Sequence, residues 1–206
     1  MLDLRPALAQ CPVVAILRGV TPAEVDAVGD ALIEAGIAII EVPLNSPHPF
    51  DSIRRLAARH GAHALVGAGT VLEVADIARV EASGARLVVA PNFDPGVVRA
   101  ASDAELFTLP GVMTPSEGFA ALKAGADGLK LFPAEILPPA VVKAWRAVFP
   151  HDALLLAVGG VGVENIAAYR DAGASGFGIG SALYKPGRPA AEIGKAAQAL
   201  VAAAKA

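Results

Sequence analysis

A short helix-ending element recurs four times in this chain, each time just before a run of apolar residues. Each copy places a glycine after an alanine-rich segment with helical spacing, and a strand-like run follows at once. The copies are Ala35-Gly36-Ile37, Ser83-Gly84-Ala85, Ala124-Gly125-Ala126 and Ala172-Gly173-Ala174. Glycine is favoured there because it adopts the left-handed backbone that ends many helices without a steric penalty. The element predicts a repeated helix–glycine–strand unit, which restricts the chain to the α/β folds.

The strand-like runs are short, apolar and bounded by Gly, Pro or polar residues, which is typical of strands buried on both faces. We expect them at Val13–Leu17, Ala38–Val42, Ala64–Ala68, Arg86–Ala90, Glu105–Leu109, Gly128–Phe132, Leu154–Val158 and Gly176–Ile179. Two of the intervening helices are predicted to start with a capping box that holds proline at the first helical position. These boxes are Thr21-Pro22-Ala23-Glu24 and Thr114-Pro115-Ser116-Glu117.

Eight strands that alternate with about eight helices predict a (β/α)8 TIM barrel. The unit of about 25 residues lies near the lower size limit of that fold. An open doubly wound sheet is the competing architecture. Against it, the segment from Gly67 to Leu72 does not complete a G-x-G-x-x-G motif. Since no linker or low-complexity segment divides the chain, we expect residues 1–206 to form a single barrel domain.

The bulk composition bounds the class of partner and the compartment. The formal net charge of -3 and the pI of about 5.8 give no reason to expect a nucleic acid or an anionic membrane as partner. Cys11 stands alone, so no disulfide framework exists and we expect a reducing compartment, the cytoplasm. The start of the chain has no secretory signal pattern. Hydrophobic content of 54%, much of it alanine, hints at a buried subunit interface.

Lys130 is the single charged residue in the predicted sixth strand. Burying an ammonium group without a partner costs several kcal/mol, so a lysine there tends to lose its proton. A neutral amine in an apolar pocket is a nucleophile that can attack a carbonyl group and form a Schiff base. The alternative is a lysine on a solvent-exposed face, or one whose stem reaches out to water.

Polar and glycine residues follow the predicted strands, at the barrel end where active sites lie. Besides Lys130 they are Arg18, Glu41, Asn45, Thr70, Pro91, Gly159, Gly160, Gly180 and Ser181. Each has a simpler structural explanation when taken alone, but together they predict one ligand site. The glycine pair and Gly180-Ser181 follow strands 7 and 8, where barrels often bind phosphate through backbone N–H groups. Metal chemistry is disfavoured because His48, His60, His63 and His151 have no ligand spacing.

These motifs resemble the class I aldolases that cleave 2-keto-3-deoxy-6-phospho sugar acids. The resemblance rests on Ile16-Leu17-Arg18-Gly19, Glu41-Val42-Pro43-Leu44, Gly67-Ala68-Gly69-Thr70-Val71-Leu72, Leu129-Lys130-Leu131-Phe132-Pro133, Gly159-Gly160 and Gly180-Ser181. It runs from about Val13 to Tyr184, with the motifs in order. It implies a homotrimer of barrels, no metal or organic cofactor, and a phosphorylated keto-deoxy sugar acid and pyruvate as ligands.

Two branches of that family differ at these positions. The phosphogluconate branch typically carries an arginine where this chain has Asn45, and a threonine where it has Val158. Here Arg18 supplies the cation instead. The segments Ile-Leu-Arg-Gly, Glu-Val-Pro-Leu-Asn-Ser-Pro and Val-Gly-Gly-Val look like the phosphogalactonate branch. The resemblance therefore favours the galactonate epimer, while activity on the gluconate epimer, which differs only at C4, stays open.

The resemblance also implies a division of roles. Lys130 forms the Schiff base, and Glu41, on a strand that faces Lys130 across the barrel, acts as acid and base. Arg18 and Thr70 hold the substrate carboxylate, and the glycines with Ser181 hold the phosphate. Two other functions stay open: a phosphate-binding isomerase or epimerase in which Lys130 acts only electrostatically, and a catalytically silent ligand-binding or scaffold barrel.

Overall fold

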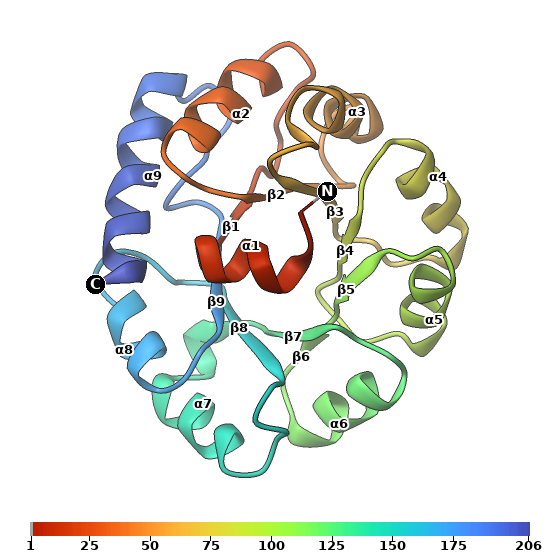
Figure 1. Ribbon diagram of the computed structural model, residues 1–206, viewed down its shortest axis with the longest axis vertical. Coiled ribbons are helices and arrows are strands. Elements are labelled where there is room, and N and C mark those ends of the chain that lie inside the picture. Colours follow the sequence, from red (N-terminus) through yellow and green to blue (C-terminus); the bar gives the residue numbers. More distant parts are fainter. Residues whose placement is uncertain (1) are drawn as a thin grey trace.

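The computed structural model describes residues 2–206, which form a nearly closed barrel of parallel strands surrounded by helices (Figure 1). The strands are β1 (Val13–Ile16), β2 (Ile39–Pro43), β3 (Leu65–Gly69), β4 (Leu87–Val89), β5 (Phe107–Leu109), β6 (Gly111–Val112), β7 (Gly128–Leu131), β8 (Leu154–Val158) and β9 (Gly176–Ile179). They are hydrogen-bonded in the order β5-β4-β3-β2-β1-β9-β8-β7-β6. The predicted TIM barrel is confirmed, and each predicted strand has its counterpart within two residues at either end.

Strands β5 and β6 together occupy one strand position of the barrel and are separated by Pro110. Proline has no N–H to donate to a strand ladder, so the strand is interrupted there. The interruption still contributes to the sheet, because the Pro110 carbonyl accepts from the Lys130 N–H at 2.9 Å. Beyond it, Gly111 pairs with Lys130 in parallel register. The nine strands in residues 2–206 therefore occupy eight strand positions of the nearly closed barrel.

Eight helices lie around the outside of the barrel (Figure 1). They are α2 (Val25–Glu34), α3 (Pro49–His60), α4 (Ile77–Ala82), α5 (Pro95–Asp103), α6 (Pro115–Lys123), α7 (Pro139–Arg146), α8 (Ile166–Asp171) and α9 (Ala190–Lys205). Two short 3-10 turns, η1 (Val74–Asp76) and η2 (Ala134–Ile136), precede α4 and α7. None of the helices in residues 2–206 has both the length and the apolar character needed to cross a membrane.

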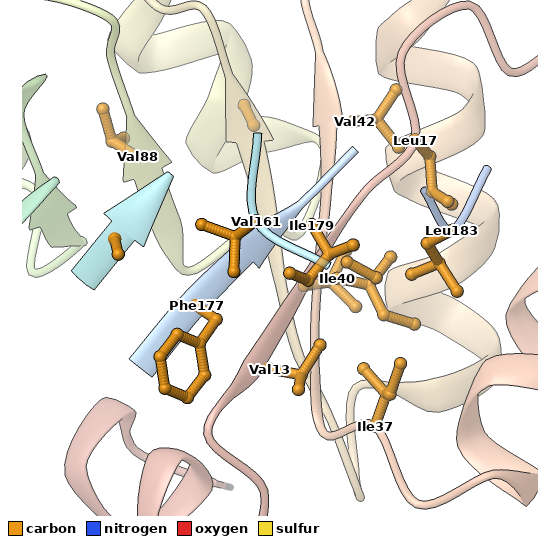
Figure 2. Packing of buried hydrophobic residues seen from close by; sticks show 14 of the residues in the cluster. Val13, Leu17, Ile37, Ile40, Val42, Val88, Val161, Phe177, Ile179 and Leu183 are labelled. Carbon is orange, nitrogen blue, oxygen red and sulfur yellow. The ribbon is translucent and has the colours of Figure 1, made fainter. Parts of the chain in front are cut away.

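Side chains that point alternately outward and inward along each strand divide the core into two layers. Residues such as Val13, Ile40 and Phe177 point outward and pack under the helices (Figure 2). Their neighbours along the strands, such as Val14 and Ile39, belong to a separate cluster inside the barrel. A strand has a side-chain period of two, so the sequence parity of a residue decides which layer it joins.

A helix that the sequence did not lead us to expect, α1 (Leu4–Gln10), lies across one end of the barrel (Figure 1). Its buried side chains Leu4, Ala7 and Leu8 join the cluster inside the barrel. The helix is short and has no side-chain cap, so its stability comes from this packing. It covers the amino ends of the strands, opposite the end at which sites are built.

The predicted helix ends are confirmed at the four glycines, one of the two predicted capping boxes is present, and the other is wrong. Gly36, Gly84, Gly125 and Gly173 have φ angles of +90°, +82°, +102° and +100°. The capping box between Thr114 and Glu117 is present at the start of α6. The box predicted between Thr21 and Glu24 does not start a helix, because residues 22–24 form a turn and α2 begins at Val25. There the Glu24 carboxylate accepts from the Thr21 and Tyr184 hydroxyls instead of from the backbone.

Candidate active site

Three of the predicted residues point into the barrel because of their sequence parity. Lys130 on β7 lies between the outward-facing Leu129 and Leu131. Glu41 on β2 lies between the outward-facing Ile40 and Val42. Arg18 continues the inward-facing series of β1 just beyond the end of that strand, two residues after Ile16. The three charged groups therefore converge on the carboxyl ends of the strands.

Lys130 lines a cavity of about 500 Å³ at this end of the barrel while remaining only 5% exposed. Its ammonium nitrogen lies 4.7 Å from the centre of the Phe132 ring. Burial lowers the pKa of Lys130 most strongly, the nearby Glu41 opposes this effect, and Arg18 lowers the pKa further. The net shift is downward, which raises the fraction of neutral, nucleophilic amine.

Glu41 is 2% exposed and shares a void of about 10 Å³ with Lys130, walled mostly by aliphatic side chains of the barrel interior. Burial raises its pKa from 4.5 to about 7, although Lys130 and then Arg18 act in the opposite direction. Its Oε2 atom is buried without a hydrogen-bond partner among residues 2–206. A carboxyl group with a pKa near 7 and a free oxygen suits general acid–base chemistry.

Arg18 is held by the neighbouring loops. Its Nη1 donates to Asn45 Oδ1 at 2.6 Å, and its Nη2 donates to Thr70 Oγ1 at 3.5 Å. Thr70 has a φ of +54°, a left-handed conformation that costs a β-branched residue about 1–2 kcal/mol. Thr70 is not the N-cap of a helix, because the next helical turn begins at Val74. These contacts bring Arg18, Asn45 and Thr70 together on one side of the mouth.

Gly159 and Gly160 follow β8 and line the same cavity as Lys130, together with Gly180 and Ser181 after β9. The φ angles of the glycine pair are +101° and +64°, which other residues rarely adopt. A Cβ at Gly160 would lie 2.5 Å from the Cγ of Glu135. The turn is therefore fitted closely under Glu135, a residue that the sequence analysis did not single out.

Other lining residues were missed as well. Lys185, Glu135 and Glu164 bring one cation and two carboxylates to the wall formed by the loops after β7, β8 and β9. All three follow the strands by several residues, within loops that have no periodicity to mark them. Of the predicted site residues, Glu41, Asn45 and Thr70 do not line this cavity, and neither does Pro91. Its carbonyl packs where a Cβ of Gly111 would lie, 2.2 Å away, so it joins two loops of the rim.

None of the histidines His48, His60, His63 and His151 lines the cavity that Lys130 lines. Within residues 2–206 no group of three or more His, Cys, Asp or Glu side chains is placed to hold a metal ion. His60 ends α3, and its Nε2 lies 3.2 Å from Asp30 Oδ1 on α2. It therefore belongs to the contact between two outer helices.

Known proteins share both the sequence and this arrangement of strands. The model of the family described as KDPG and KHG aldolase matches residues 4–194. A protein of Rhizobium meliloti (strain 1021) named "Probable 2-dehydro-3-deoxy-6-phosphogalactonate aldolase" is 49% identical over 93% of this chain and 91% of its own. The solved structure titled "Native KDPGal structure" superposes with a TM-score of 0.93 at 42% identity, covering 94% of each chain.

A more distant solved structure, at 25% identity and a TM-score of 0.83, covers 95% of this chain and 97% of its own. It is described as KDPG aldolase from Legionella pneumophila with pyruvate captured as a covalent carbinolamine intermediate. Because the family model spans nearly the whole barrel and the close relatives cover the chain almost end to end, the chain belongs to the KDPG and KHG aldolase family.

Proposed function

We propose that this protein is a class I aldolase that cleaves 2-dehydro-3-deoxy-6-phospho-D-galactonate into pyruvate and D-glyceraldehyde 3-phosphate. The observation that carries the proposal is the buried amine of Lys130 beside the buried carboxyl of Glu41, at the base of an open cavity. The names of the Rhizobium relative and of the KDPGal structure support the choice of substrate. The covalent carbinolamine of pyruvate in the Legionella aldolase supports covalent chemistry at an amine.

Lys130 begins the reaction as a neutral amine. Its nitrogen attacks the C2 ketone of the substrate, and the resulting carbinolamine takes up one proton and loses water to leave an iminium ion. The positively charged iminium accepts the electron pair that is released when a carbon–carbon bond breaks. The lowered pKa of Lys130 favours the first step, because a protonated amine has no free electron pair.

Glu41 accepts and returns the proton that moves during cleavage. As a carboxylate it takes the proton of the C4 hydroxyl, so that C4 becomes an aldehyde while the C3–C4 electrons pass to the iminium. Glyceraldehyde 3-phosphate leaves, and an enamine of pyruvate stays on Lys130. Glu41 then returns its proton to C3, and water hydrolyses the iminium to release pyruvate and the free amine. One carboxyl with a pKa of about 7 can serve in both directions near neutral pH.

The two charged ends of the substrate are assigned to opposite sides of the mouth. Arg18, steadied by Asn45, pairs with the carboxylate, and the Thr70 hydroxyl adds a donor. The backbone N–H groups of Gly159 and Gly160, with Gly180 and Ser181, receive the phosphate. Lys185, from the same wall of the cavity, adds the positive charge that these neutral donors lack.

The choice between the C4 epimers rests on Asn45 and Val158. Val158 faces into the cavity beside Lys130, and it cannot donate a hydrogen bond as a threonine could. The alternative is an aldolase that prefers the gluconate epimer or accepts both. A comparison of kcat/KM for the two epimers, with pyruvate release as readout, decides between them. A strong preference for the gluconate epimer would contradict the galactonate assignment and leave the aldolase assignment intact.

The covalent step is tested by trapping. Pyruvate with borohydride should modify Lys130 irreversibly, and mass spectrometry of a peptide digest should locate the added mass there. Lys130→Met should form no adduct and should lose cleavage by at least about a thousandfold while remaining folded. Near-normal cleavage in a folded Lys130→Met variant would exclude the mechanism. An isomerase or epimerase that uses Lys130 only electrostatically predicts conversion without any trapped adduct.

For the assembly we propose a homotrimer. Phe119 on α6 is 45% exposed and stacks on Phe149 with 4.3 Å between ring centres, and the adjacent Val148 is 60% exposed. Exposed apolar side chains that gather on one surface commonly mark a protein interface, here with a second copy of the chain. Sedimentation velocity should give three copies for the wild type and a smaller species for Phe119→Glu. Val74→Glu, at an equally exposed apolar residue of η1, is the matched control and should leave the assembly unchanged.

The compartment stays a prediction from the sequence. We propose the cytoplasm, because Cys11 has no second cysteine to pair with. Cys11 is fully buried and belongs to the cluster between the strands and the outer helices.

A further inference from the structure

A buried tyrosine joins two loops of the cavity rim without lining the cavity itself. Tyr184 is 3% exposed and lies in the loop between β9 and α9. Its hydroxyl donates to the Glu24 carboxylate, at the end of the loop between β1 and α2. The other oxygen of that carboxylate accepts from the Thr21 hydroxyl at 3.2 Å. One oxygen of Glu24 therefore joins the two loops, and the other is held by Thr21 within the loop that carries Glu24 itself.

The same two loops carry residues assigned to opposite ends of the substrate. The β1–α2 loop contains Arg18, and the β9–α9 loop contains Ser181. The Tyr184 backbone N–H donates to the Gly180 carbonyl at 2.9 Å, so that the tyrosine belongs to the turn that presents Ser181. The hydroxyl contact with Glu24 thus runs between the phosphate side and the carboxylate side of the site.

Close packing accompanies this contact. A Cβ at Gly19, the residue next to Arg18, would lie 2.9 Å from the Cγ of Pro186, so the two loops touch where glycine leaves room. Gly19 has a φ of +86°, and its N–H donates to Ser46 Oγ at 2.9 Å. The β1–α2 loop is therefore fixed on both sides, by the β2–α3 loop and by the β9–α9 loop.

We propose that Tyr184 and Glu24 are positioning residues that hold the carboxylate-binding loop at a set distance from the phosphate-binding loop, and thereby select phosphorylated six-carbon acids. The proposal rests on the proposed function, because it takes Arg18 and Ser181 as the two anchors. A substrate held at both ends is sensitive to the separation of the anchors, whereas one held only by its carboxylate is not. The high pKa of Tyr184, raised by burial and by Glu24, keeps its hydroxyl a donor throughout the working pH range.

The test compares three variants with two substrates. Tyr184→Phe and Glu24→Ala each remove the contact. Glu24→Gln is the conservative control, because its amide oxygen can accept from Tyr184 and its amide nitrogen can donate to Thr21. Steady-state kinetics are measured with the phosphorylated substrate and with the same keto-deoxy acid lacking the phosphate.

We expect Tyr184→Phe and Glu24→Ala to raise KM for the phosphorylated substrate about tenfold, the order expected for one lost hydrogen bond to a charged group. Their kcat should stay within about twofold, and kcat/KM for the unphosphorylated acid should not change. Glu24→Gln should behave like the wild type. The double variant Tyr184→Phe with Glu24→Ala should be no worse than either single variant, because both remove the same contact.

Three outcomes would overturn the proposal. One is a proportional loss of kcat/KM on both substrates, which indicates general loosening of the fold. Another is an unchanged KM with a lowered melting temperature, which indicates a purely structural hydrogen bond. The third is a Glu24→Gln variant as impaired as Glu24→Ala. Should Tyr184→Phe fail to fold, the contrast between the two Glu24 variants still decides.

Borohydride trapping with pyruvate is run on every sample. It reports on Lys130 alone and should be equal in the wild type, the three single variants and the double variant. Failure of trapping in the wild type would count against the proposed function. A wild type that is trapped, with variants whose substrate selectivity is unchanged, would count against the positioning role only.

Discussion

The carboxyl group of Glu41 lies directly against Gly69, the last residue of β3, so that a Cβ at this glycine would come within 1.7 Å of Oε2. Strands β2 and β3 run side by side with Pro43 opposite Gly69, which puts this glycine beside the inward-facing Glu41. The Gly-Ala-Gly-Thr segment thus has a steric role at this point, because its second glycine provides the space that the carboxyl group of Glu41 occupies.

Gly69→Ala should therefore displace Glu41 without disturbing Lys130. A displacement of about 1 Å in a catalytic group can cost about a hundredfold in rate, and we expect a loss of that order in kcat. Trapping of the pyruvate imine should persist. Gly194→Ala on α9 is the matched control, since a Cβ there meets nothing closer than 3.6 Å. A Gly69→Ala variant with normal kcat would show that the position of Glu41 is not critical.

The decrease of kcat/KM at low pH, the acid limb of the pH profile, should report the protonation of Glu41. Its pKa of about 7 means that the carboxylate needed to accept the C4 proton becomes scarce below neutrality. We expect kcat/KM for cleavage to fall about tenfold per pH unit well below pH 7, measured by pyruvate release between pH 5 and 8. Glu41→Gln should be slower by about a hundredfold or more and should lack this limb. A limb centred near 4.5, the usual value for a glutamate, would contradict the effect of burial.

Stability should change with pH in the opposite sense to that expected for a carboxylate whose pKa is lowered on folding. The folded protein binds the Glu41 proton more tightly than the unfolded chain does, so its free energy of unfolding falls as pH rises from 4.5 to about 7. The full shift corresponds to about 3 kcal/mol as an upper value. Urea unfolding at several pH values should give a growing advantage of Glu41→Gln over the wild type that levels off above pH 7.

The matched control for this measurement is Glu81→Gln, at an exposed position of α4, which should show no such trend. If the wild type instead gained on Glu41→Gln over the same pH interval, ionised Glu41 would be stabilised by Lys130 more than it is penalised by burial.

The carboxylate of Glu135 over the glycine pair should weaken phosphate binding. A Cβ at Gly159 would lie 2.5 Å from its Oε2, so the group occupies the wall to which we assign the phosphate. Like charges repel at this range, but the site is open to water, so the effect should be modest. We expect Glu135→Gln to lower the inhibition constant of inorganic phosphate about threefold at low salt and less at high salt, a size typical of partly screened charges.

Glu81→Gln changes the net charge by the same amount away from the cavity and should leave phosphate inhibition unaltered. Weaker inhibition in Glu135→Gln would mean that the side chain helps to hold the phosphate, for example by ordering the turn beneath it.

Side-chain parity explains why so much of this site was predictable from the sequence. Once the eight strands are placed, the period of two fixes Glu41 and Lys130 as inward-facing, and the carboxyl end of the barrel follows from the strand direction. Glu135 and Lys185 escaped prediction because they lie in loops, where no period connects sequence to direction. Their position depends on how the loops after β7 and β9 fold back over the glycine turn.

The capping box at Thr21 was mispredicted for a reason that the local sequence does not contain. Threonine, proline and glutamate at that spacing favour a helix start, and the same pattern at Thr114 forms one. At Thr21 the glutamate is drawn away by Tyr184, which lies 160 positions further along the chain. Long-range contacts of this kind are invisible to a pattern confined to four residues.

Helix α1 has a kinetic consequence. It fills the amino end of the barrel with Leu4, Ala7 and Leu8, so traffic to Lys130 passes through the opposite end, where the cavity lies. When ligands enter and leave by the same end of the barrel, the ligand that is bound deepest leaves last. On the proposed mechanism we expect the three-carbon fragment on Lys130 to lie behind the phosphorylated aldehyde. The aldehyde should then depart first, and in the direction of synthesis pyruvate should bind before the aldehyde.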